Sequence, residues 1–129
     1  MTIADTDVLV DYLAGRGGLA GVVAAELEMG TLRTTVVNRF ELLAGARTPR
    51  QQETVRQLLA AVPALSLDPP AADRAAELRR TLESRGETLG MGDSLIAGIV
   101  LAHGETLMTR NRRHFGRVEG LRIAEPGGR

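Results

Sequence analysis

Cysteine is absent from this 129-residue sequence, and only two histidines occur, His103 and His114. Without thiols, disulfide bonds and thiolate chemistry are excluded, and zinc could be held only by His, Asp or Glu. Two imidazoles also exclude a histidine-rich metal centre. A metal site in this chain would therefore be built mainly from carboxylate and other oxygen ligands.

Lysine is absent as well, because all sixteen basic residues are arginines, and the formal net charge is zero. Zero net charge gives no support for bulk affinity to nucleic acid. Five arginines nevertheless fall between Arg110 and Arg122, against the single acid Glu119. Arginine matches phosphate oxygens in a bidentate manner, so this segment is either a phosphate-binding surface or an arginine-rich solvated surface. Aromatic residues make up only 2% of the chain, and a base-stacking platform is not expected.

Long apolar runs are missing too. No stretch approaches the roughly 20 apolar residues of a membrane span. The opening residues, MTIAD, contain no basic segment, so we expect a cytoplasmic protein without a signal peptide. A chain of this length can bury one full core. We expect a single domain over residues 1–125, followed by a short polar tail over residues 126–129.

Short strand-like stretches alternate with helical patterns along the chain. Strands are predicted at residues 2–4, 32–37, 62–67, 105–108 and 120–124, and helices from Thr6, over 19–29, from Asn38, over 50–61, over 71–84 and from Asp93 to Gly104. Asn38 is predicted to cap its helix, with Glu41 at the third position. Pro63 favours an edge position for its strand. The alternation predicts a three-layer α/β domain, with a parallel sheet of four to five short strands and helices on both faces.

Three acids and one amide lie where these strands meet helices. Asp5 follows the first strand, and Glu41 lies in the helix after the second. Asp93 opens the helix before the fourth strand, and Asn111 follows that strand. The carboxyl ends of parallel strands face one crevice, which would gather all four residues. Clustered carboxylates repel unless a cation compensates, and oxygen ligands favour Mg²⁺ or Mn²⁺. The same spacing also fits separate helix caps and surface acids.

Four segments of the chain resemble, in order, the PIN domain of the small toxins in VapBC-type toxin–antitoxin pairs. They are IADTDVLVDYL, VVNRFELLAGAR, GDSLIAGIVLAHGETLMTRNRRHF and VEGLRIAEP. PIN domains are metal-dependent ribonucleases with a parallel sheet and an acidic pocket. The resemblance implies that Asp5, Glu41 and Asp93 bind Mg²⁺, with Mn²⁺ as an alternative, and that Thr6 and Thr109 form hydrogen bonds at the pocket.

The chain departs from the family pattern at the fourth acid. Asn111 stands where many members carry Asp, and His114 stands where others place one. Asn111 is included among the catalytic residues because its amide could orient a metal-bound water, although it adds no charge. His114 could contact a phosphate, or it could simply cap a turn beside Phe115. Asp7 is interpreted as an acid of the first helical turn, and Asp11 as a salt-bridge partner.

The resemblance implies a Mg²⁺-dependent endoribonuclease, the toxin of a type II toxin–antitoxin system, which cleaves structured RNA such as tRNA or ribosomal RNA loops. Its arginines would hold phosphates: Arg110, Arg112, Arg113 and Arg47. A cognate VapB-like antitoxin would block the acidic pocket, in a homodimer or a toxin–antitoxin hetero-oligomer. The alternative is a catalytically weak PIN-like module that binds RNA or protein. Aspartyl phosphotransferases and receiver domains are set aside, because they need a lysine near the phosphate.

Overall fold

Five strands form a parallel sheet in the order β3-β2-β1-β4-β5. The computed structural model describes residues 2–124, so the predicted tail over residues 126–129 lies outside the described residues. The strands are β1 (Thr2–Ala4), β2 (Leu32–Thr35), β3 (Ala64–Leu65), β4 (Thr106–Met108) and β5 (Arg122–Ile123). The helices are α1 (Thr6–Leu13), α2 (Ala20–Met29), α3 (Val36–Gly45), α4 (Pro49–Ala61), α5 (Pro69–Ser84), α6 (Met91–His103) and α7 (Arg112–Phe115).

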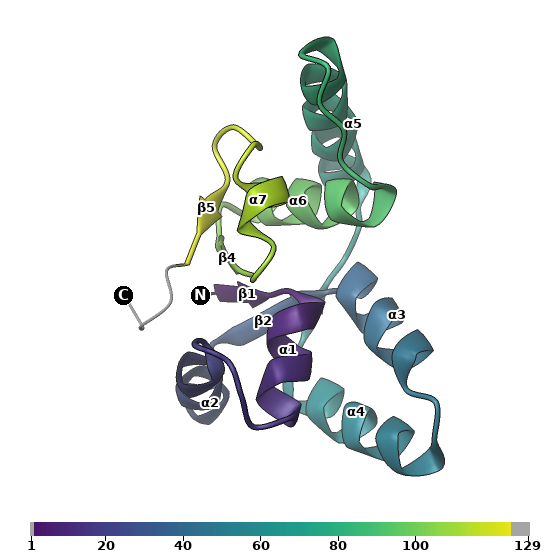
Figure 1. The fold of residues 1–129 in the computed structure, drawn as a ribbon, viewed down its shortest axis with the longest axis vertical. Helices are drawn as coiled ribbons and strands as arrows, with labels where there is room; N and C mark the ends of the chain where they lie inside the picture. The colour runs from purple at the N-terminus through teal and green to yellow at the C-terminus, as the bar shows by residue number, and fades with distance from the viewer. Residues whose placement is uncertain (1, 125–129) are drawn as a thin grey trace.

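Helices cover both faces of the sheet (Figure 1), which confirms the predicted three-layer α/β class. One core packs α1, α2, α3 and α4 against the face that carries Ala4 and Met108. The other packs α5, α6 and α7 against the face that carries Ile3 and Leu107. Adjacent residues of β1 and β4 enter opposite cores because successive side chains of a strand point to opposite faces. All four side chains are fully buried, as expected for central parallel strands.

The close contact between α5 and α6 depends on a glycine. A Cβ atom added at Gly98 would lie 2.6 Å from the carbonyl oxygen of Ala71 and 2.7 Å from the Cβ of Ala75. Both alanines are buried, so the two helix backbones approach each other across small side chains. Because α6 is held against α5 in this way, the position of its first turn, which carries Asp93, is fixed as well.

The predicted start of the third helix is wrong. Thr35 is the N-cap of α3, because its side chain accepts a hydrogen bond from the Asn38 backbone N–H, and the helix begins at Val36. The predicted cap, Asn38, is a fully buried residue inside the helix. Glu41 is therefore at the sixth helical position rather than the third. The β-branched pair Val36-Val37 had suggested a longer strand, whereas the Thr35 cap ends β2 earlier.

The two edge strands are shorter than predicted, and one helix was not predicted. Strands expected over residues 62–67 and 120–124 reduce to Ala64–Leu65 and Arg122–Ile123. An edge strand pairs on one side only, and Pro63 offers no N–H for pairing. The edge position that Pro63 favoured is confirmed. The short helix α7 lies where no helix was predicted. Within residues 2–124, no helix is long and apolar enough to cross a membrane.

Candidate active site

The central strands β1 and β4 bring Asp5 and Thr109 together. Their register pairs Ala4 with Met108, and the Asp5 backbone N–H donates to the Met108 carbonyl oxygen at 2.9 Å. Asp5 and Thr109 come directly after this pair, so they lie beside each other at the strand ends. The Thr109 hydroxyl donates to Asp5 Oδ2 at 2.7 Å, and both side chains are buried. The first predicted acid and one predicted supporting threonine are therefore in direct contact.

The carboxylate of Asp5 is held by three donors. Besides Thr109, the Thr6 backbone N–H donates to Oδ1 at 2.8 Å, and Asn38 Nδ2 donates to the same oxygen at 2.9 Å. As the N-cap of α1, Asp5 also meets the positive end of the helix dipole. These contacts fix one orientation of the carboxylate at the carboxyl end of β1. Asn38 was predicted only as a helix cap, and its contact with Asp5 was not foreseen.

A hydrogen-bond chain links Asp5 to Glu41. Asn38 Nδ2 also donates to the Thr6 hydroxyl oxygen at 3.0 Å, and the Thr6 hydroxyl donates to Glu41 Oε1 at 2.5 Å. The other oxygen, Glu41 Oε2, lies 3.3 Å from the position that a Cβ of Gly92 would occupy. The first turn of α6 therefore passes close to Glu41. Thr6 thus forms a hydrogen bond with a predicted acid, and its role in a functional pocket stays a prediction.

Asp93 completes the acidic cluster from the first turn of α6. Burial raises the pKa of Asp93, and repulsion from the carboxylates of Asp5 and Glu41 raises it further, whereas the nearby His114 lowers it. Asp93 therefore interacts electrostatically with both of the other predicted acids. Each comes from a different element: Asp5 from the end of β1, Glu41 from α3 and Asp93 from α6.

Asn111 also reaches the cluster. Its Nδ2 donates to Asp93 Oδ2 at 3.3 Å, and its backbone N–H donates to the Thr109 hydroxyl oxygen at 3.0 Å. Its Oδ1 lies 2.8 Å from Nδ1 of His114. The structure thus brings together all four residues predicted as catalytic, together with both predicted threonines.

A further acid, Asp7, lies on the rim of the cluster in the first turn of α1, as predicted. Its Oδ2 accepts a hydrogen bond from the Arg110 backbone N–H at 3.1 Å. Its Oδ1 is buried without a hydrogen-bond partner among residues 2–124. Burial raises the pKa of Asp7, and repulsion from Asp5 adds to this, while Arg110 lowers it. Asp7 therefore anchors the segment after β4 to the start of α1.

The four arginines predicted to bind RNA differ in their surroundings. Arg110 Nε donates to Asp11 Oδ2 at 2.6 Å, so the buried Asp11 neutralises part of its charge and is a salt-bridge partner as predicted. Arg112 Nη1 donates to the Ala124 carbonyl oxygen. Arg113 is exposed on α7, and Arg47 is exposed between α3 and α4. The prediction that these arginines hold phosphates stays a prediction.

The donor set fits a hydrated hard cation better than a closed cage. Within residues 2–124, no group of three or more His, Cys, Asp or Glu side chains is close enough together to hold a metal ion without further ligands. Magnesium keeps several of its waters and needs only one or two carboxylates. The repulsion that raises the pKa of Asp93 is the kind of strain that a cation relieves. The oxygen donors of the cluster are therefore of the type that Mg²⁺ or Mn²⁺ prefers, with waters completing the coordination.

A groove of about 650 Å³ is lined by residues of α1, α3 and α4 and of the segment between α3 and α4. Thr6 and Glu41 of the acidic cluster are among its lining residues. The lining is largely apolar, and it includes Val10, Leu13, Leu42, Ala46 and Val55. The groove therefore combines one carboxylate of the cluster with an apolar surface.

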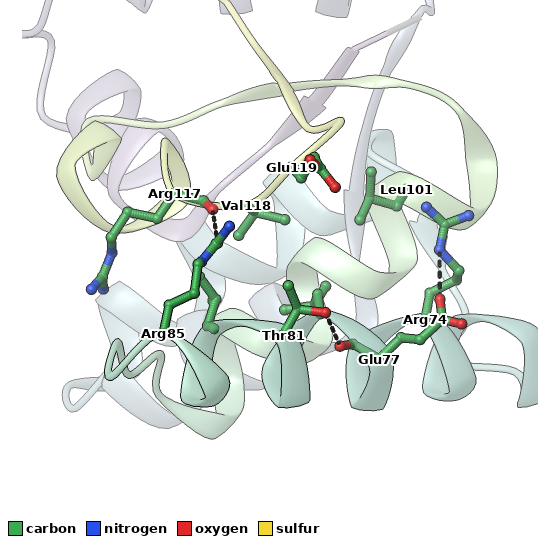
Figure 2. Close-up of a pocket in the computed structure, with 10 residues that line it drawn as sticks. Arg74, Glu77, Thr81, Arg85, Leu101, Arg117, Val118 and Glu119 are labelled. Carbon is green, nitrogen blue, oxygen red and sulfur yellow. Dashed lines mark hydrogen bonds and ion pairs between the residues drawn. The ribbon is translucent and has the colours of Figure 1, made fainter.

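Figure 2 shows a different hollow of about 340 Å³, between α5, α6 and the segment before β5. Its arginines are bonded within the protein. Arg74 pairs with Glu77 at 3.8 Å, Arg85 Nη2 donates to the Arg117 carbonyl oxygen at 3.3 Å, and Arg117 Nη2 donates to the Thr88 carbonyl oxygen at 2.6 Å. None of the predicted catalytic residues lines it. The acidic cluster is therefore the candidate active site.

Fold and site together define a class of protein, an α/β domain with a pocket of carboxylates at the carboxyl ends of its parallel strands. Such a pocket is suited to binding a divalent cation and a phosphodiester. Residues 2–121 match the family model of the PIN domain. The chain belongs to the PIN domain family.

Comparison with known proteins supports this assignment. Over its full length the chain is 32% identical to Ribonuclease VapC10 of Mycobacterium tuberculosis, 98% of which is covered. It is 30% identical to the tRNA(fMet)-specific endonuclease VapC of Shigella flexneri, over 77% of this chain and 78% of that protein. The fold is similar to a chain of the DNA-bound VapBC structure from Salmonella typhimurium, with a TM-score of 0.85 and 23% identity, covering 95% of this chain and 96% of that chain.

Proposed function

We propose that this protein is a metal-dependent endoribonuclease, with Asp5, Glu41 and Asp93 as the ligands of Mg²⁺ or Mn²⁺. The observation that carries the proposal is the convergence of these three acids from β1, α3 and α6, with mutual repulsion that raises the pKa of Asp93. Membership of the PIN domain family and likeness to proteins named ribonuclease and endonuclease support the reaction class.

In this proposal, each residue has a physical role. A bound metal would supply an activated water and stabilise charge on the oxygens of the phosphodiester. The donors Thr109, Thr6 and Asn38 hold Asp5 in one orientation, and the Thr6 hydroxyl holds Glu41. Preorganised ligands need no rearrangement during the reaction, which is the condition for efficient electrostatic stabilisation.

We further propose that the substrate is a structured RNA, such as a tRNA or ribosomal RNA loop, in the cytoplasm. One relative is named for its specificity for tRNA(fMet). Loops expose unpaired nucleotides that a protein surface can reach. The scarcity of aromatic residues disfavours recognition by stacking, so contacts from arginines to the phosphates would provide most of the affinity.

The groove along α1, α3 and α4 suits a partner protein, and we propose that the chain is the toxin of a type II toxin–antitoxin pair. Proteins of the same fold occur in VapBC complexes. An antitoxin segment with an apolar face would occupy the groove beside Leu13, Leu42 and Val55. A basic side chain at its end would reach Glu41 and block the acidic cluster, in a hetero-oligomer or around a homodimer.

The test is cleavage of a total-RNA pool by the purified protein with Mg²⁺ or Mn²⁺. Discrete products are expected, and Asp5→Ala and Asp93→Ala should reduce cleavage at least about 100-fold, the scale of lost transition-state stabilisation. The matched control is Asp73→Ala, because Asp73 is an exposed acid on α5. RNA binding without metal-dependent cleavage would instead support the alternative, a catalytically weak binding module.

A further inference from the structure

His114 lies at the outer end of a hydrogen-bond chain that starts at Asp93. Asn111 Nδ2 donates to Asp93 Oδ2 at 3.3 Å, and Asn111 Oδ1 lies 2.8 Å from His114 Nδ1. A carboxylate only accepts hydrogen bonds, so the amide nitrogen must face Asp93 and the amide oxygen must face the imidazole. His114 Nδ1 is therefore the donor in this contact. The ring nitrogen that this bond does not use is Nε2.

The charge of His114 opposes that of the acidic cluster. Among the groups that act on the pKa of Asp93, burial, Asp5 and Glu41 raise it, and His114 lowers it. The imidazole is exposed on α7, so it faces both the cluster and solvent. By contrast, Arg110 of the same segment is paired with the buried Asp11 at 2.6 Å. When both of its ring nitrogens carry a proton, His114 brings positive charge to the edge of a pocket that otherwise repels a phosphate.

We propose that His114 is a phosphate-binding residue, whose Nε2–H donates to a non-bridging phosphate oxygen of RNA beside the acidic cluster. Asn111 is the positioning residue that holds the ring at Nδ1. The inference rests on the proposed function, since it assumes that RNA occupies this site. An RNA strand approaching Asp5, Glu41 and Asp93 meets like charge, and a cation at the rim offsets that repulsion without adding a ligand to the metal.

The main test is the affinity of a short fluorescent single-stranded RNA, measured by anisotropy in EDTA at about pH 6, where imidazole can carry charge. The variant His114→Asn keeps an amide donor in the place of Nδ1 but removes Nε2 and the charge. We expect the RNA affinity to weaken about 3- to 10-fold. The slope of the logarithm of the affinity against the logarithm of the salt concentration should become less negative by about 0.7, as for one lost phosphate contact. The variant His114→Arg should restore both values.

The matched control is His103→Asn. His103 is exposed at the end of α6, where its Nδ1 contacts the Ile99 carbonyl oxygen at 2.9 Å. Since the chain has only these two histidines, labelled imidazoles of the unmodified protein should give two NMR signals. Added RNA should shift the His114 signal and leave the His103 signal unchanged. This second measurement does not depend on the folding of any variant.

Equal RNA affinity and salt dependence in the wild type and His114→Asn would overturn the inference, and so would an unchanged His114 signal. Cleavage with Mg²⁺, measured in parallel, separates this failure from failure of the proposed function. If the wild type cleaves RNA and His114→Asn binds RNA as tightly as the wild type does, only the proposed role of His114 is contradicted. If the wild type neither binds nor cleaves RNA, the proposed ribonuclease function and the proposed role of His114 are both contradicted.

Discussion

Uncharged side chains build much of the acidic pocket. The amide of Asn38 donates to Asp5 and to Thr6, and the Thr6 hydroxyl donates onward to Glu41. Asn38 itself is fully buried and contacts the Thr35 hydroxyl at 2.7 Å. Two acids from separate elements are thus connected through one amide and one hydroxyl. Such a buried network, when its members are satisfied, favours a single arrangement of the groups it holds.

The electrostatic strain on Asp93 predicts a pH-dependent stability. Burial, then Asp5 and Glu41, raise the pKa of Asp93 above its ordinary value of 3.8. A carboxyl group with a raised pKa binds its proton more readily in the folded chain, so its ionisation destabilises the fold. That cost is absent below the ordinary pKa and complete above the raised one. Asp93→Asn should therefore stabilise the metal-free protein at pH 7, and this gain should disappear towards pH 3.

Urea unfolding in EDTA at a series of pH values measures this effect. With excess Mg²⁺ the order should reverse, because the wild type gains stability by binding the cation. A variant that is no more stable than the wild type at pH 7 in EDTA would show that Asp93 is not strained by its neighbours.

The acids of the site were predictable one by one, whereas the network that orients them was not. Asp5, Glu41 and Asp93 lie in segments that resemble PIN domains, and Thr6 and Thr109 follow from the same resemblance. Asn is one of the residue types preferred at helix N-caps, so the sequence alone suggested that role for Asn38. Its burial and its contact with Asp5 depend on how α3 packs against β1, which is tertiary information.

The α5–α6 contact positions Asp93 and predicts a large effect of one methyl group. Gly98→Ala would place Cβ 2.6 Å from the Ala71 carbonyl oxygen, so the two helices must separate. We expect a loss of about 1–3 kcal/mol or more in the free energy of unfolding, as for overpacked cores, together with weaker cleavage. Denaturant unfolding is the measurement.

The control is Gly21→Ala in α2, where an added Cβ would meet no atom within 4 Å. That variant should gain about 0.5–1 kcal/mol, because alanine is the better helix former. Equal stability of the two variants would contradict the account of the α5–α6 contact.

Helices with a clear apolar face were predictable, and the exceptions have physical reasons. The αL glycines Gly30 and Gly104 end α2 and α6 as their positions indicated. Helix α7 has only four residues, too few for an apolar periodicity to be visible. The edge strands shorten because each pairs on one side only. The close approach at Gly98 was not predictable, since a glycine inside a helical pattern signals no particular neighbour.

The parallel sheet brings the residues of the candidate site together. Asp5 and Thr109 are 104 residues apart in sequence, yet they share a hydrogen bond at the ends of adjacent strands. The alternation of strands and helices favoured a common edge for Asp5 and the end of the fourth strand, because the carboxyl ends of parallel strands lie together. The part played by Thr109 followed only from the family resemblance. The order of the strands, with β1 between β2 and β4, explains why acids from α3 and α6 converge on Asp5.

The proposed activity depends on Asp5, Glu41 and Asp93 binding a divalent cation together. Calorimetric titration with Mn²⁺ measures this binding. We expect wild-type protein and Asp73→Asn to bind equally, each of Asp5→Asn, Glu41→Gln and Asp93→Asn to bind at least about tenfold more weakly, and Asn111→Asp to bind more tightly through its added charge. Equal Mn²⁺ affinity in the wild type and the three acid variants would contradict the account.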